Sequence, residues 1–185
     1  MIGPQGNETS MALLDFGTPP PSLKAAGERR GSVALEVRAP LWLDGLGISY
    51  RLNHVDALQL REYARSRWVG PPARLVEQRL GQRLDLASAG QMRGKCLLRI
   101  DLTEFSQVFA SPDDSSGLLQ GRAFWLGPER QPLAERRLSI SSPAATADAR
   151  GGVTALKTAV DRLAEELLAW ERELAAGGKI AVCQD

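Results

Sequence analysis

The stretch Ile48–Leu84, ISYRLNHVDALQLREYARSRWVGPPARLVEQRLGQRL, changes its hydrophobic pattern from that of strands to that of a helix. Residues 47–53 read as one strand, and residues 57–63 as a second strand that pairs with it. The turn 53–56 between them is short enough for a hairpin. The stretch therefore predicts a strand hairpin that leads into a helix.

Two prolines separate the hairpin from that helix. Pro71 and Pro72 suit a helix start, because proline is tolerated in the first turn. The helix is expected to end near Leu84 and to be followed by a loop over residues 86–94. Its apolar stripe is expected to contain Leu75, Val76, Leu80 and Leu84. The side chains expected to face water are Arg74, Glu77, Gln78 and Gln82.

The residues before the hairpin predict two further strands. Residues 1–10 are rich in polar residues, glycine and proline, and are expected to form a disordered tail. Residues 11–16 suit an edge strand, and residues 17–31, with three consecutive prolines, suit a linker or surface loop. Residues 32–39 alternate as a half-buried strand does. The segment that follows is predicted to be a turn packed on the core; its apolar residues are Leu41, Trp42, Leu43 and Leu46.

Three long strands are predicted after the helix. In residues 96–104 apolar residues alternate with polar ones, and the apolar phase then slips to Phe105 and Phe109. Such a slip indicates a bulge, or a strand that leaves its sheet. Residues 118–126 and 132–141 follow after turns, which predicts an antiparallel meander.

The long helix predicted over residues 151–176 has the most regular pattern in the chain. Its apolar residues recur at spacings of three and four, and the stripe consists of Val153, Leu156, Val160, Leu163, Leu167, Trp170 and Leu174. Gly177 and Gly178 are expected to end the helix. Residues 179–183 are expected to form a short final strand.

The order of these elements predicts the fold class. A chain of 185 residues suits one domain, and we expect a single α/β domain over residues 11–185. A strand–helix–strand crossover favours a parallel pair, whereas the hairpins favour antiparallel ones. We therefore expect a mixed, largely antiparallel, twisted sheet with two main helices packed on it, a layered sandwich like those of anticodon-binding domains and the TolB N-terminal domain.

The sequence contains no recognisable catalytic, cofactor or metal motif. Its one histidine, His54, lies in a predicted turn, and Cys96, Cys183 and His54 do not have the spacing of a zinc site. Phosphate-binding glycine motifs are absent. With a net charge of +1, the chain has no overall field that would attract nucleic acid. These observations favour a protein that is not an enzyme, has no cofactor or metal, and does not bind nucleic acid.

The two cysteines leave two readings open. A bond between Cys96 and Cys183 would attach the C-terminal segment to the sheet and would contribute about 4 kcal/mol in an oxidising compartment. Alternatively, they are two unrelated thiols, with Cys96 a small core residue. Residues 1–10 lack the apolar segment of a signal peptide, so a cytosolic protein and a mature exported one both stay open.

The stretch also resembles a known family, the ABC-type transport auxiliary lipoproteins of the PqiC/YmbA type. The resemblance covers roughly residues 11–175. In the first half it rests on Leu43-Asp44, ISYR at 48–51, YARSRW at 63–68 and Pro71-Pro72. In the second half it rests on LRIDL at 98–102, FSQ at 105–107, GRA at 121–123 and GGVTA at 151–155.

The resemblance implies a non-enzymatic bacterial protein in the periplasm, anchored to the outer membrane by an N-terminal lipid. It implies an ABC transporter complex and a mammalian-cell-entry (MCE) type protein as partners in intermembrane lipid transport. Self-association is compatible with such a subunit. Residues 1–10 contain no cysteine to carry a lipid, so we expect either an anchor missing from this sequence or a natural variant without one. A stand-alone periplasmic lipid or peptide carrier is the alternative, and it would need an apolar cavity.

The conspicuous residues of the stretch have a structural and a functional interpretation. They form a strand-to-helix corner packed on the core, or an exposed docking surface for a partner. The candidates are Tyr50, Tyr63, Arg67, Trp68, Pro71 and Pro72. The same two interpretations apply to Trp42, and exposure of its indole would favour an interface.

Overall fold

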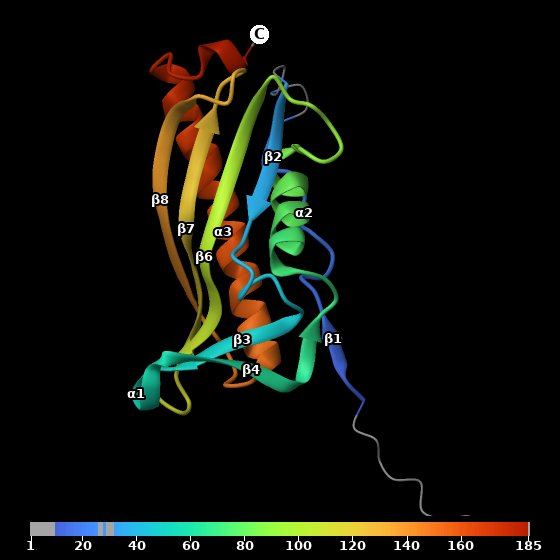
Figure 1. Cartoon of the computed structure of the whole chain (residues 1–185), viewed down its shortest axis with the longest axis vertical. Coiled ribbons are helices and arrows are strands. Elements are labelled where there is room, and N and C mark those ends of the chain that lie inside the picture. The colour runs from blue at the N-terminus through green and yellow to red at the C-terminus, as the bar shows by residue number, and fades with distance from the viewer. Residues whose placement is uncertain (1–9, 26–27, 29–31, 185) are drawn as a thin grey trace, which may run out of the picture.

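The computed structural model describes residues 10–25, 28 and 32–184, and in these residues one eight-stranded sheet carries two long helices (Figure 1). Apart from Ser10, the predicted tail 1–10 lies outside the described residues. The strands are β1 (Ala12–Leu14), β2 (Val33–Arg38), β3 (Gly47–Leu52), β4 (Ala57–Trp68), β5 (Ala87–Ser88), β6 (Cys96–Phe109), β7 (Ser115–Leu126) and β8 (Pro132–Pro143). The helices are α1 (Asn53–Asp56), α2 (Pro72–Leu84), α3 (Ala149–Ala176) and the 3-10 turn Ala181–Cys183.

Strand β6 is the centre of the sheet. One of its edges pairs antiparallel with β7 along its length, and β7 pairs in the same way with β8. Its other edge is shared, because β2 runs parallel to residues 96–101 and β3 runs parallel to residues 107–109. Strands β4 and then β1 continue the sheet beyond β3, and this part lies across the lower end of the molecule in Figure 1. The predicted mixed α/β sheet is confirmed.

Helices α2 and α3 pack on the same core. The predicted stripe of α3 is buried in full, and the helix lies against β6, β7 and β8. Helix α2 buries Val76, Leu80 and Leu84 against β2, β5 and α3, whereas Leu75 is half-buried. Asp148 caps α3 by accepting a hydrogen bond from the backbone N–H of Gly151. No helix of the described residues has both the length and the apolar character needed to span a bilayer.

The phase slip in β6 is a bulge, as one of its two readings predicted. The register with β7 shifts between Leu102 and Glu104. After the shift Phe105 faces the core again, while Glu104 lies beside β3. Two nitrogens of the Arg51 guanidinium, Nε and Nη2, each donate a hydrogen bond to the Glu104 carboxylate at 3.1 Å. The bulge therefore turns a carboxylate toward the strand that pairs with the last part of β6.

Four local predictions need correction. Residues 179–183 form a turn and the 3-10 helix rather than a strand, and in this turn Ile180 and Cys183 are buried. Strand β4 continues to Trp68, well beyond the predicted end at Tyr63, because its last three residues pair with β1. The predicted turn 53–56 is one turn of α-helix, and the predicted loop 86–94 contains β5.

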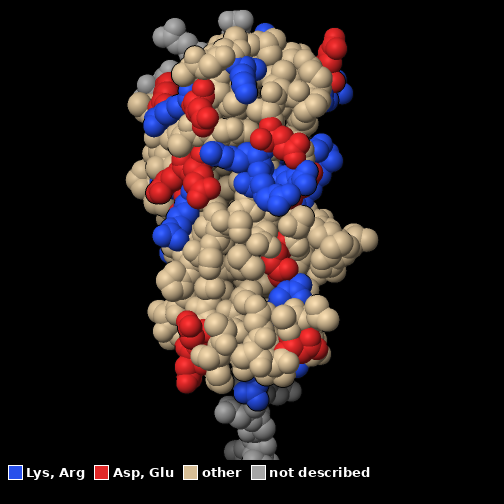
Figure 2. All heavy atoms as spheres, turned by 90° about the vertical axis from the view of Figure 1, so that its left-hand side faces the viewer, with Lys and Arg blue, Asp and Glu red and all other residues tan. Residues whose placement is uncertain are grey.

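The charged residues are mixed in sign over the face shown in Figure 2. Lysine and arginine lie beside aspartate and glutamate, mostly in the upper half. On the outer strands, Arg122 of β7 and Glu135 of β8 form an ion pair with 2.7 Å between the nitrogen and the oxygen. This face has no broad area of positive charge of the kind that nucleic-acid backbones require.

Candidate functional site

The two tyrosines of the stretch stack near the junction of β3 and β6. The ring centroids of Tyr50 and Tyr63 lie 4.6 Å apart, and Phe109 meets Tyr50 edge-on at 6.1 Å. The Tyr63 hydroxyl donates to Oε1 of Gln107 at 2.7 Å, and Nε2 of Gln107 donates to Oγ of Ser115 at 2.8 Å. Burial, with Tyr50 and Asp148 nearby, raises the pKa of Tyr63. The hydroxyl of Tyr63 and the side-chain amide of Gln107 are therefore engaged in hydrogen bonds that connect β4, β6 and β7.

Trp68 occupies the strand-to-helix corner. Its side chain is only 1% exposed and packs edge-on against Phe16, with 5.5 Å between the ring centroids. The ring of Phe105 lies 5.9 Å away on β6. Pro72 is buried at the start of α2 and Pro71 precedes it. Arg67, by contrast, is exposed on the opposite face of β4. Of these candidate residues, Trp68 and Pro72 therefore belong to the buried corner, whereas Arg67 lies on the surface.

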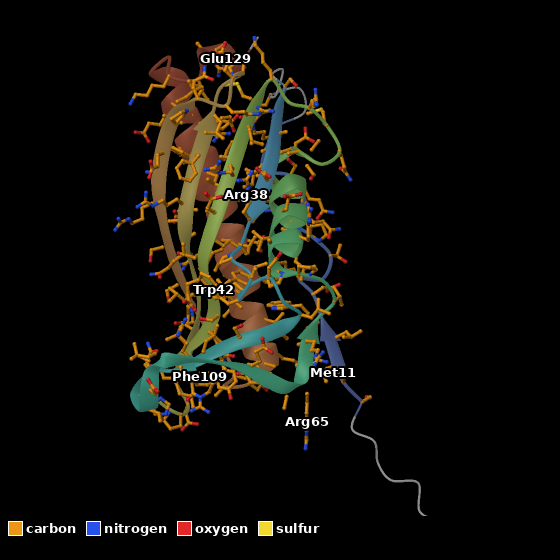
Figure 3. The ribbon with its side chains drawn as sticks, in the orientation of Figure 1. Met11, Arg38, Trp42, Arg65, Phe109 and Glu129 are labelled. Carbon is orange, nitrogen blue, oxygen red and sulfur yellow. A yellow bond between two sulfur atoms is a disulfide. The ribbon has the colours of Figure 1, made fainter. Side chains whose placement is uncertain are left out.

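The loop Pro40–Leu46 between β2 and β3 exposes apolar side chains. Leu41 is 93% exposed, Trp42 69% and Leu46 44%, whereas Leu43 is 4% exposed. The prediction of a turn packed on the core is therefore confirmed for Leu43 and wrong for the other three. Figure 3 places Trp42 midway along the molecule.

The same loop is held by backbone hydrogen bonds. The N–H groups of Leu43 and Asp44 both donate to the carbonyl of Pro40, at 2.9 and 3.1 Å. The N–H of Trp68 donates to the carbonyl of Leu46 at 2.8 Å. With Leu43 anchored in the core, the loop presents its exposed side chains from a fixed base. This arrangement suits contact with a partner, because little ordering entropy remains to be lost on binding.

Glu77 lies on the inner side of α2, contrary to the prediction that it faces water. It is 6% exposed. Its Oε2 accepts from the backbone N–H of Val37 at 2.8 Å, and its Oε1 accepts from the hydroxyl of Ser88 and, at 3.2 Å, from Arg74. The carboxylate therefore connects α2 to β2 and β5. A backbone N–H, a hydroxyl and a guanidinium of the protein hold the carboxylate, so Glu77 stabilises the packing of α2 on the sheet.

Arg79 is a buried residue that the sequence pattern did not single out. It donates to both carboxylate oxygens of Asp161 on α3, each at 2.8 Å, and to the carbonyl of Phe16 at 3.1 Å. Arg83, one turn later, donates to the carbonyl of Pro21. These arginines fasten the two helices and the proline-containing segment together. A spacing of four between arginines on one helix face was the available signal, but their partners are distant in sequence.

Replacing Asp161 with asparagine is expected to lower the free energy of unfolding by about 2 kcal/mol. The change leaves the buried Arg79 guanidinium without its charged partner; because the Asp161 side chain is 23% exposed, water compensates in part. Urea unfolding measures the effect, with Glu166→Gln on the exposed side of α3 as the control. Equal midpoints for the two variants would contradict the role of this ion pair.

Two further features that could bind a metal ion or a ligand are His54 and a groove beside α2. No group of three or more histidine, cysteine, aspartate or glutamate side chains in the described residues is arranged to hold a metal ion. His54 is exposed on α1, with Nδ1 3.4 Å from the carbonyl of Phe109. An open groove of about 820 Å³ runs between α2 and the β5 loop. Its walls include Arg74, Gln82 and Asp85, so it does not form the apolar cavity that a lipid carrier needs.

Cys96 and Cys183 are joined by a disulfide. Their Cα atoms lie 5.6 Å apart, and the bond closes a loop with a sequence separation of 87 residues. Both residues are buried, at 0% and 2% exposure. The bond attaches the C-terminal turn to the start of β6. Such a bond persists in oxidising compartments.

Comparison with known families decides the classification. Residues 14–167 match the model of the ABC-type transport auxiliary lipoprotein component. The chain belongs to this family. No curated protein matches the sequence. The matched region contains all of the quoted stretch and almost the whole sheet, and it ends at Leu167, within α3.

Two solved structures share the fold of this auxiliary lipoprotein family member. Protein XCC0632 from Xanthomonas campestris, of family DUF330, superposes with a TM-score of 0.71 at 17% sequence identity, covering 89% of this chain and 96% of its own. A second crystal structure, of an uncharacterized protein, gives 0.65 at 16% identity, covering 89% and 99%. At these identities the likeness establishes the fold alone. Members of the auxiliary lipoprotein family are components of transport systems, and the family is not a known enzyme family.

Proposed function

We propose that this protein is a non-enzymatic periplasmic subunit of an MCE-type, ABC-transporter-linked system that moves lipids between the two bacterial membranes. It would act by docking to other proteins while an N-terminal lipid holds it at the outer membrane. Membership in the auxiliary lipoprotein family supports a transporter complex as the partner. The disulfide between Cys96 and Cys183 supports an oxidising compartment.

The exposed pair Leu41 and Trp42 carries the docking part of this proposal. Tryptophan is enriched among the residues that dominate protein interfaces, and an indole that is 69% exposed has most of its apolar area still to bury. The fixed base of the loop, with Leu43 in the core, presents the pair without a folding step on binding. A partner groove with apolar walls would fit this loop.

Trp42→Ala is expected to reduce capture of an MCE-type partner from native membranes at least ten-fold, because a central interface tryptophan commonly contributes about 2 kcal/mol or more. Partner recovered with the affinity-tagged full chain measures the effect. Met92→Ala, which alters an exposed apolar residue on another loop, is the control and should retain capture.

Two results would overturn the proposal. Undiminished capture by Trp42→Ala would show that the loop is not part of the interface. Failure of the unaltered protein to associate with any MCE-type protein would show that the proposed partner is wrong. Mass spectrometry of the purified protein tests the alternative that it is a lipid carrier. A lipid that copurifies with the protein in stoichiometric amount would favour a carrier over a docking subunit.

A further inference from the structure

The edge strand β1 and the end of β4 place apolar and basic side chains on one face of the sheet. The two strands are parallel, with Leu13 beside Arg67 and Ala12 beside Ser66. Residues that are partners across a ladder point to the same face, and residues two apart on a strand do so as well. Leu13 and Arg67 therefore share a face, and Met11 and Arg65 each lie two residues before them in the chain, Met11 just before β1 and Arg65 where the register of β4 with β3 shifts. We call these four residues the β1–β4 patch.

The β1–β4 patch is open to solvent. Leu13 is 63% exposed and Met11 is 43% exposed, and both arginines are exposed. The neighbouring residues on the other face point inward, since Trp68 is buried and Leu14 packs on the core. The sheet thus has an inner face that belongs to the core and an outer face with nothing packed on it among the described residues.

The arginines of the β1–β4 patch have no carboxylate partner within the described part of the chain. An acidic side chain lies close by, because a Cβ atom added at Gly47 would sit 2.1 Å from the Glu62 carboxyl carbon, and Gly47 is the ladder partner of Arg67. Among the described residues no ion pair joins Glu62 to either arginine. Both guanidinium groups therefore remain available to an external anion.

The position of the patch distinguishes it from the Trp42 loop. In Figure 3, Met11 and Arg65 lie together at the lower end of the molecule, with the Arg65 side chain directed away from the body. Trp42 lies midway along the molecule, and the C-terminal turn lies at the opposite end (Figure 1). The first residue that the structure describes, Ser10, directly precedes Met11, so the fold is entered beside the patch.

We propose that the β1–β4 patch binds the surface of an anionic phospholipid membrane. Guanidinium groups bind phosphates through two parallel hydrogen bonds. Exposed methionine and leucine side chains beside them can enter the boundary between headgroups and acyl chains. The proposal rests on the proposed function in one respect: a protein held by an N-terminal lipid turns this end of the fold toward its membrane.

Vesicle binding of the purified full chain, without a lipid anchor, tests the patch directly. The protein is expected to sediment with vesicles of phosphatidylglycerol and phosphatidylcholine, and to do so less as salt rises. Each arginine should contribute about five-fold near such a surface, so Arg65→Gln with Arg67→Gln is expected to lower the partition coefficient about twenty-fold. Leu13→Ser should lower it several-fold, with little dependence on salt.

Matched variants separate the patch from overall charge. Arg93→Gln with Arg137→Gln removes the same charge from exposed positions elsewhere and should leave binding within about two-fold. Glu62→Gln removes the nearby acid and should strengthen binding. Equal binding by the Arg65/Arg67 and Arg93/Arg137 variants would overturn the proposal, as would equal binding of the unaltered protein to anionic and neutral vesicles.

The experiment also separates this proposal from the docking proposal. If the Arg65/Arg67 variant retains vesicle binding but loses partner capture, the patch is a protein interface and the membrane proposal is wrong. If it loses vesicle binding and retains capture through Trp42, both proposals stand. Loss of capture by Trp42→Ala with normal vesicle binding supports both as well, so the two can fail independently.

Discussion

Replacing Trp68 with alanine should lower the free energy of unfolding by about 3–5 kcal/mol, the usual range for a large aromatic side chain removed from a core. The indole is 1% exposed and lies between Phe16 and Phe105, so its loss leaves a cavity where β1, β4 and β6 meet the helices. Chemical denaturation followed by circular dichroism gives the free energy without relying on tryptophan fluorescence.

Trp42→Ala is the matched control, because it makes the same chemical change at a side chain that is 69% exposed. Its effect on the free energy of unfolding should stay below about 1 kcal/mol. An unchanged unfolding midpoint for Trp68→Ala, together with lost partner capture, would exchange the roles of the two tryptophans. The pair thus separates folding from docking by one substitution at two sites.

Removing the disulfide should cost about 3–4 kcal/mol, because a loop as long as the one it closes restricts the unfolded chain strongly. The sequence separation of the two cysteines is 87 residues. Cys96→Ala with Cys183→Ala keeps both buried positions apolar, so most of the loss reports the cross-link itself. Denaturant unfolding with and without a thiol reductant measures it.

The double-alanine variant provides the internal control, since a reductant should shift the midpoint of the unaltered protein and leave the variant unchanged. Two reactive thiols in the unfolded, unreduced protein would show that the bond does not form. A large stability loss in the variant with no reductant effect on the unaltered protein would point to packing at Cys96 and Cys183.

The spacing of apolar residues predicted those elements that pack one regular face against the core. The seven stripe residues of α3 are all buried, because one helix face meets one continuous core. The slip before Phe105 marked the bulge, because a single extra residue changes which side chains face inward. Both signals are local, and sequence contains them in full.

Contacts between distant segments were not predictable in the same way. The helical pattern predicts that Glu77 faces water, but its carboxylate is buried because the backbone N–H of Val37 and the hydroxyl of Ser88 donate hydrogen bonds to it. Arg79 and Asp161 lie 82 residues apart. Residues 179–183 alternate like a strand, yet the disulfide and the burial of Ile180 hold them as a turn. In each case a partner from elsewhere in the chain decided the conformation.

Trp42 and Trp68 show the same limit for the candidate site. Trp42 lies between Leu41 and Leu43, whereas Trp68 lies between Arg67 and Val69, and these neighbours do not show which indole packs inward. The difference arises because Leu43 rather than Trp42 anchors its loop, and because β4 extends far enough for Trp68 to pair with Leu14. Exposure of an aromatic residue is a property of the folded chain.

The short ladder between β1 and β4 has a mechanical consequence. Within the described residues, three register pairs, Ala12 to Leu14 with Ser66 to Trp68, join the first strand to the rest of the sheet. Tension applied to the N-terminus would therefore load this ladder first, and the strand would peel away before β6, β7 and β8 yield. If an N-terminal lipid anchors the protein as proposed, detachment of β1 would lengthen the connection to the membrane while the disulfide-linked remainder keeps its shape.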